Sequence, residues 1–126
     1  MKSKSVESVM RSPPIMAWFS DTVSSVVEKM VSNNIGAVIV VDNDLVPFGI
    51  ITERDIIEKI VWARRDPDKT LAQEIMSAPI ITIEVGKSIR DALKLMHDNQ
   101  IRRLAVTKNG ILVGIVTERR ILDSLI

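Results

Sequence analysis

Apolar residues recur three and four positions apart in two stretches of the chain, residues 23–31 and 89–96. This spacing places the apolar side chains on one face of a helix. Asp21 or Thr22 can cap the N-terminus of the first helix, and Ser88 opens the second with a capping-box-like sequence. The pattern predicts two amphipathic helices, each with one face against a sheet.

Each predicted helix is followed by a short run rich in β-branched residues, at 37–41 and 104–107. A polar turn and a second run follow, ending at Thr52 in one case and at Thr117 in the other. Such pairs of runs are typical of β-hairpins. The second turn contains Asn-Gly at 109–110, which favours a tight hairpin turn.

Two further patterns complete the expected fold. Apolar positions within 56–61 and 121–126 predict another helix after each hairpin. Short extended segments around 15–16 and 80–83 follow prolines and add a first strand. The order strand, helix, strand, strand, helix occurs twice, which indicates a mixed α/β (α+β) protein built from two βαββα repeats.

The two halves are copies of each other. Met10 recurs as Met76, an offset of 66 (76 − 10 = 66), and six further positions in the same stretch share it. The offset falls to 65 at Gly49 and Gly114 (114 − 49 = 65), because the first hairpin turn is one residue longer. We therefore expect repeats at 1–66 and 67–126, joined by a charged linker at about 64–70.

Composition narrows the functional classes. The 126 residues are 46% hydrophobic, 3% aromatic and free of cysteine, which suits one compact aliphatic core and excludes disulfides and thiolate chemistry. With 17 Lys and Arg against 16 Asp and Glu, no overall field favours nucleic acid or an anionic membrane. No apolar run is long enough for a signal peptide or a membrane span, so we expect a soluble cytoplasmic protein.

One motif connects the duplication to a known family. The sequence Gly-Ile-Ile-Thr-Glu-Arg-Asp at 49–55 ends the first hairpin and begins the following helix. Met-x-x-Pro starts occur at Met10 and Met76, and Ile-Arg-Arg-Leu at 101–104 enters the second hairpin. Together these features resemble a tandem pair of cystathionine-β-synthase (CBS) domains, in which Gly, two mostly apolar residues, Thr or Ser, two variable residues and Asp form the motif. The resemblance covers nearly the whole chain.

The resemblance implies one CBS-pair (Bateman) module, with its repeats related by a pseudo-twofold axis. Two clefts between the repeats would bind an adenosine-type ligand such as AMP, ADP, ATP or S-adenosylmethionine. Such pairs often form dimers, here a homodimer, and they regulate an attached or associated protein partner. No cofactor other than that ligand is implied.

Thr52 and Asp55 are the main candidate site residues. In the ligand-binding interpretation, Asp55 accepts hydrogen bonds from both ribose hydroxyls and the Thr52 hydroxyl faces a phosphate near a helix N-terminus. Thr-x-x-Asp is also a helix capping box, which needs no ligand. The same residues are able to serve both roles.

The second repeat departs from the motif. Thr117 keeps the hydroxyl position, but Arg120 occupies the position of Asp55 (120 − 65 = 55). Arginine is a donor only and cannot accept from ribose hydroxyls, whereas it suits phosphate. The second cleft is therefore expected to be degenerate or biased toward phosphate contacts.

Arg102 and Arg103 lie at the strand entrance, with Arg119 and Arg120 at the helix start. One interpretation is a phosphate clamp, and the other is an ordinary solvated edge. Arg102 and Arg103 alternate along a strand, so they cannot both face one cleft. Gly36 stands where the other repeat has Arg102 and leaves room for a ligand or marks a strand bulge.

By analogy with the family, apolar residues would line the adenine slot. They are also plain candidates for the core. The residues are Ile50, Met76, Ile80, Ile81 and Ile101.

The sequence favours a non-enzyme. His97 is the single histidine, and neither a Walker loop nor a dinucleotide-binding glycine motif occurs. We therefore expect no catalytic residues and no metal site. The alternatives to a nucleotide sensor are a ligand-free dimerisation or partner-docking module and, less favoured by the charge balance, a nucleic-acid binder.

Overall fold

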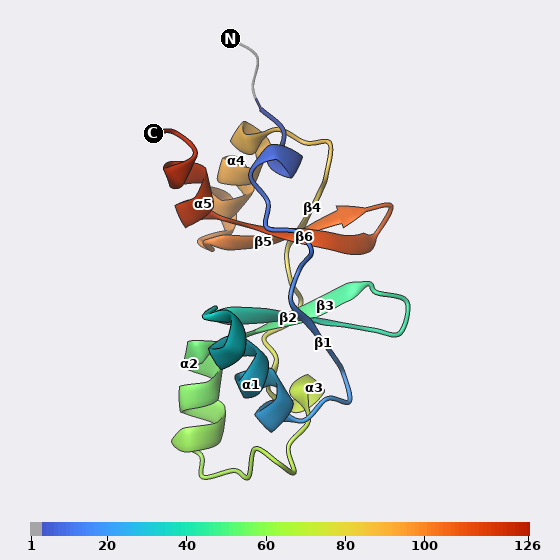
Figure 1. The fold of residues 1–126 in the computed structure, drawn as a ribbon, viewed down its shortest axis with the longest axis vertical. Coiled ribbons are helices and arrows are strands. Elements are labelled where there is room, and N and C mark those ends of the chain that lie inside the picture. Colours follow the sequence, from blue (N-terminus) through green and yellow to red (C-terminus); the bar gives the residue numbers. More distant parts are fainter. Residues whose placement is uncertain (1–3) are drawn as a thin grey trace. The chain divides into compact units, whose positions relative to one another are not determined.

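The computed structural model describes residues 4–126, which form two compact units (Figure 1). Residues 15–80 make the first, here called the central unit. Residues 4–14 and 81–126 make the second, here called the terminal unit. Each unit has one three-stranded sheet and helices of its own, so the predicted mixed α/β fold with two similar repeats is confirmed.

The central unit has a sheet in the order β1-β2-β3, with β1 parallel and β3 antiparallel to β2. Its helices lie on one side of the sheet (Figure 1). Its elements are β1 (Met16–Trp18), α1 (Val23–Asn33), β2 (Ala37–Val41), β3 (Pro47–Thr52), α2 (Glu53–Ile56), the π-helical η2 (Ile57–Val61) and α3 (Ala72–Ile75).

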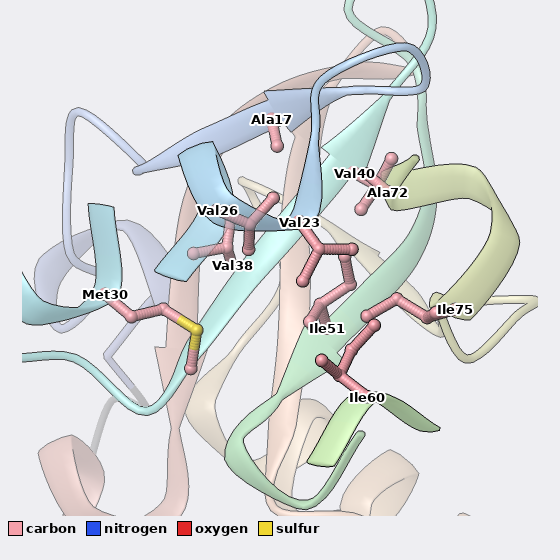
Figure 2. Close-up of a cluster of buried hydrophobic side chains, with 10 residues drawn as sticks. All are labelled: Ala17, Val23, Val26, Met30, Val38, Val40, Ile51, Ile60, Ala72 and Ile75. Carbon is pink, nitrogen blue, oxygen red and sulfur yellow. The ribbon is translucent and has the colours of Figure 1, made fainter. Parts of the chain in front are cut away.

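The core of the central unit explains this arrangement. Helical spacing brings Val23, Val26 and Met30 to the buried face of α1, where they meet alternate residues of the sheet. Side chains from η2 and α3 close the cluster, with Ile60 beside Ile75 in Figure 2. A segment that follows the charged linker therefore completes the core of the first hairpin.

The terminal unit repeats the design with a sheet in the order β4-β5-β6. Its buried cluster again joins the sheet to one face of each helix. Its elements are η1 (Val6–Ser8), β4 (Thr82–Glu84), α4 (Ile89–Asn99), β5 (Arg103–Lys108), β6 (Ile111–Thr117) and α5 (Glu118–Asp123).

Several local predictions are confirmed. The Thr22 side chain caps α1 by accepting from the amide of Ser25, and Ser88 forms the expected capping box at α4. Asn109 and Gly110 both have positive φ in the second hairpin turn, as a tight turn requires. The bulge considered at Gly36 is absent there, because the shift in the β2–β3 register lies between Val40 and Val41.

The opening segment of each repeat packs with the strands and helices of the other repeat. In the central unit, the amide of Ala72 donates to the carbonyl of Asp21 at 2.8 Å. The terminal unit has the equivalent bond from Val6 to Lys87, also 2.8 Å. The compact units therefore differ from the sequence repeats 1–66 and 67–126. The first residues of each repeat belong to the unit of the other repeat, an arrangement that we call the exchange of opening segments.

A glycine permits this packing in each hairpin. The amides of Ile50 and Ser77 each donate to the other residue's carbonyl, at 3.0 and 2.8 Å, so the Met-x-x-Pro segment runs against β3. A Cβ atom built on Gly49 would lie 2.8 Å from the sulfur of Met76 and 2.9 Å from the carbonyl oxygen of Ser77. A Cβ atom built on Gly114 would lie 2.6 Å from the sulfur of Met10 and 2.9 Å from the carbonyl oxygen of Arg11 in the terminal unit. The glycine of the motif is thus required by the close approach of a second main chain.

We expect Gly49→Ala to lower the free energy of unfolding by about 1–3 kcal/mol, because the backbone carbonyl of Ser77 cannot move aside cheaply. Gly86→Ala is the matched control, since nothing lies within 4 Å of its added Cβ. It should change stability by less than about 1 kcal/mol. Urea denaturation of both variants measures this, and equal losses would refute the packing argument.

Candidate functional site

Asp55 is the centre of a polar cluster in the central unit. Its side chain is 9% exposed, and Oδ2 accepts from the amide of Thr52 at 2.9 Å and from the Thr52 hydroxyl at 3.1 Å. Oδ1 accepts from the Ser77 hydroxyl and from Nζ of Lys59, each at 2.9 Å. Thr52 also accepts from the amide of Asp55, so the predicted capping box is confirmed.

The same contacts set the protonation state of this carboxylate. Burial acts to raise the pKa of Asp55. The hydrogen bonds from Thr52, Lys59 and Ser77 outweigh burial, together with the positive charge of Lys59, so the pKa lies below its ordinary value. Asp55 is therefore a charged, hydrogen-bonded carboxylate at neutral pH.

Lys59 and Ser77 are the members that the sequence analysis missed. Lys59 lies one helical turn after Asp55 and also donates to the carbonyl of Ile75 at 2.8 Å. Ser77 comes from the segment that packs against β3. The spacing of four residues between Asp55 and Lys59 was a visible signal. Ser77 had no such signal, because its place depends on the exchange of opening segments.

The structure also locates the other candidate ligand-binding residues of the central unit. Ile50 pairs with Ser77. Met76 packs against the core, which was the alternative to a place in the adenine slot. Ile80 is half-buried. The carbonyl of Gly36 accepts from the amide of Glu53 at 3.1 Å, which ties the start of β2 to the start of α2. Of these residues, Gly36 therefore contacts the Thr52–Asp55 turn directly, and Ile50 is connected to Asp55 through Ser77.

The terminal unit replaces this cluster with a single arginine. Nε of Arg120 donates to the carbonyl of Val9 at 2.8 Å, and Nη2 donates to the carbonyl of Met10 at 3.4 Å. Val9 is the equivalent of Ile75 (75 − 66 = 9), so Arg120 makes directly the main-chain bond that Lys59 makes in the other unit. Thr117 caps α5 by accepting from the amide of Arg120.

The four arginines considered as a phosphate clamp or a solvated edge lie close in the fold but have different partners. Arg103 is paired with Thr117 across the hairpin, and the carbonyl of Arg102 accepts from the first amide of α5, so the strand entrance and helix start do meet. However, Arg119 forms an ion pair with Asp123 at 3.4 Å, and the guanidinium of Arg120 is held by main-chain carbonyls.

The two remaining predicted slot residues also lie in the terminal unit. Ile81 and Ile101 pack against its core. Both residues therefore contribute to core packing, which was the alternative to ligand contact. Their contact with a ligand stays a prediction.

Two kinds of feature are absent from residues 4–126. Within this part of the chain, no three side chains of the His, Asp and Glu type are grouped closely enough to hold a metal ion. No helix within the same residues has both the length and the apolar character needed to cross a membrane.

Comparison with known proteins identifies the family. The CBS domain model matches residues 6–61 and 72–126, so the chain belongs to the CBS domain family and carries a tandem pair. An uncharacterised protein of Methanopyrus kandleri is 42% identical over 98% of this chain, and one of Methanocaldococcus jannaschii is 33% identical over 93%. The chain spans 63% and 31% of the lengths of these relatives.

Solved structures share the fold. Hypoxic response protein I, determined with two coordinated zinc ions, gives a TM-score of 0.87 at 29% identity, covering 95% of this chain and 98% of that one. A CBS domain protein of Pyrobaculum aerophilum complexed with AMP gives 0.82 at 27% identity, covering 92% and 88%. The hexameric CBS-CP12 protein from bloom-forming cyanobacteria gives 0.84 at 26% identity, covering 97% and 68%.

The low pKa of Asp55 leads to a prediction about acid stability. Because its folded-state pKa is depressed, the stabilisation is complete above the unfolded value of about 3.9 and is lost as the pH falls through the folded value. Asp55→Asn should therefore lower the free energy of unfolding by about 1–3 kcal/mol at pH 7, where charged hydrogen bonds are lost. At pH 3 the difference from the native protein should shrink.

Urea denaturation at both pH values measures this difference. Glu58→Gln is the control, because it breaks only the exposed ion pair with Arg54 and should cost less than about 1 kcal/mol. A deficit in Asp55→Asn that is as large at pH 3 as at pH 7 would contradict the assignment.

Proposed function

We propose that this CBS pair is a non-catalytic regulatory module that binds an adenosine-type ligand at the Thr52–Asp55 site and signals to a protein partner. The candidate ligands are AMP, ADP, ATP and S-adenosylmethionine. The observation that carries the proposal is a buried, charged carboxylate at the position of the family motif, in the unit that also holds the half-buried Ile50 and Met76.

The chemistry of the site suits a ribose. A carboxylate accepts hydrogen bonds from two neighbouring hydroxyls, and apolar side chains suit a purine face. The AMP complex of the Pyrobaculum protein, which has the same fold, supports adenosine among the possible ligands.

The difference between the repeats supports a single ribose site in each chain. Arg120 has no acceptor to offer to hydroxyls, and its guanidinium already donates to Val9 and Met10. We therefore propose that the central unit holds the tight site and that any binding around Thr117, with Arg102 and Arg103, is weaker and directed to phosphate.

A thermal-shift screen with AMP, ADP, ATP and S-adenosylmethionine tests the proposal. A ligand at about 100 times its dissociation constant adds about 2.7 kcal/mol and raises the melting temperature by several degrees. Asp55→Asn should lose this shift, whereas Glu58→Gln should retain it. If no compound shifts the native protein, a ligand-free docking module becomes the better interpretation.

We further propose that the protein forms a homodimer through the helices of the central unit. A groove of about 430 Å³ between α1 and α2 is lined by Met30, Val31, Ile56 and Ile57, among others. Val31 is 76% exposed and the nearby Trp62 is 85% exposed, which is unusual for large apolar side chains. A second copy is the favoured occupant, because a solved relative of the same fold is hexameric.

Sedimentation velocity tests the dimer. Ile57→Glu places a charge at the groove and should convert the dimer to a monomer, because burying an unpaired carboxylate in an apolar interface is costly. The neighbouring exposed variant Glu58→Gln should remain a dimer. A monomeric native protein, or a dimer that survives Ile57→Glu, would reject this interface.

A further inference from the structure

The carboxylate of Asp55 has no acceptor position left. A carboxylate offers about four lone-pair sites, and four donors occupy them. Two donors are on Thr52, one is the hydroxyl of Ser77 and one is the ammonium of Lys59. A ribose with two hydroxyls therefore cannot bind Asp55 unless donors from the protein leave.

The donors differ in how easily they leave. The Thr52 amide is fixed at the start of α2, and the Thr52 hydroxyl oxygen is held in place because it also accepts from the amide of Asp55. Neither Ser77 nor Lys59 takes part in that cap. Both bind Oδ1, Ser77 is an exposed residue, and the Lys59 side chain is 39% exposed. Oδ1 is therefore the atom that exchanges partners.

We propose that an adenosine-type ligand displaces the hydroxyl of Ser77 and the ammonium of Lys59 from Oδ1 of Asp55, so that ligand occupancy loosens residues 75–77. We call the Asp55–Ser77 and Asp55–Lys59 contacts the Ser77 latch. The inference rests on the proposed function, since it assigns to the same site a conformational change that accompanies ligand binding.

The contacts around residues 75–77 show how the release would spread. Lys59 joins Asp55 to the carbonyl of Ile75, and Ser77 joins Asp55 to the main-chain pair with Ile50. Loss of both contacts at Oδ1 leaves this segment held by that pair, by the bond from Lys59 to the carbonyl of Ile75 and by the packing of Met76 against Gly49. The segment that completes the core is thus also the segment that the ligand loosens.

The terminal unit gives a built-in contrast. There Arg120 donates directly to the carbonyl of Val9, with no carboxylate between them for a ligand to compete for. The link from α5 to the opening segment is therefore fixed, and the exchangeable link belongs to the central unit.

Titration calorimetry with AMP on the native protein and on Ser77→Ala tests the latch. Removing one competing hydrogen bond should tighten AMP binding about fivefold. Ser24→Ala is the matched control, because it also removes a serine hydroxyl bound to a carboxylate, that of Asp68, and should leave affinity unchanged. Hydrogen exchange on the native protein is a second measurement, in which AMP should speed exchange of the Ser77 amide.

The outcomes separate the two proposals. Tighter binding by Ser77→Ala and faster exchange at Ser77 support the latch. If the native protein binds AMP but Ser77→Ala binds it equally or more weakly, or if exchange at Ser77 does not rise, the latch is wrong and the adenosine site stands. If neither protein binds AMP or the other candidate ligands, both proposals are overturned.

Discussion

The structure depends on the close approach of two main chains in each unit, where the Met-x-x-Pro segment of one repeat runs against the hairpin of the other. Gly49 and Gly114 permit the approach, because a side chain at either position would meet a methionine and a backbone carbonyl within 3 Å. In the central unit the contact brings Ile75 into the core and Ser77 to Asp55. Folding and the candidate site thus share one constraint.

The two repeats keep this framework and fill it with different chemistry. In the central unit, Lys59 reaches the carbonyl of Ile75 and the same ammonium neutralises Asp55. In the terminal unit, Arg120 makes the equivalent main-chain bond alone. Both units therefore link a helix to the opening segment, whereas the position of Asp55 is occupied by Arg120 in the terminal unit.

Periodicity and turn chemistry were enough to predict the order strand, helix, strand, strand, helix in each repeat, because these elements depend on neighbours in the chain. The short helices η1 and α3 were not predicted. The hairpins, the cap at Thr22 and the capping box at Thr52 and Asp55 all follow local rules. The exchange of opening segments is a long-range packing choice that no local pattern encodes. For that reason neither Ser77 at Asp55 nor the bond from the Arg120 guanidinium to the carbonyl of Val9 could be predicted from the sequence.

The central claim is that one repeat carries a ribose-binding carboxylate and the other does not. The stoichiometry of AMP binding to the native protein, measured by titration calorimetry, tests it most directly. We expect one tight site per chain, with no tight binding in Asp55→Asn. Two equivalent sites per chain, or undiminished binding by Asp55→Asn, would contradict the claim.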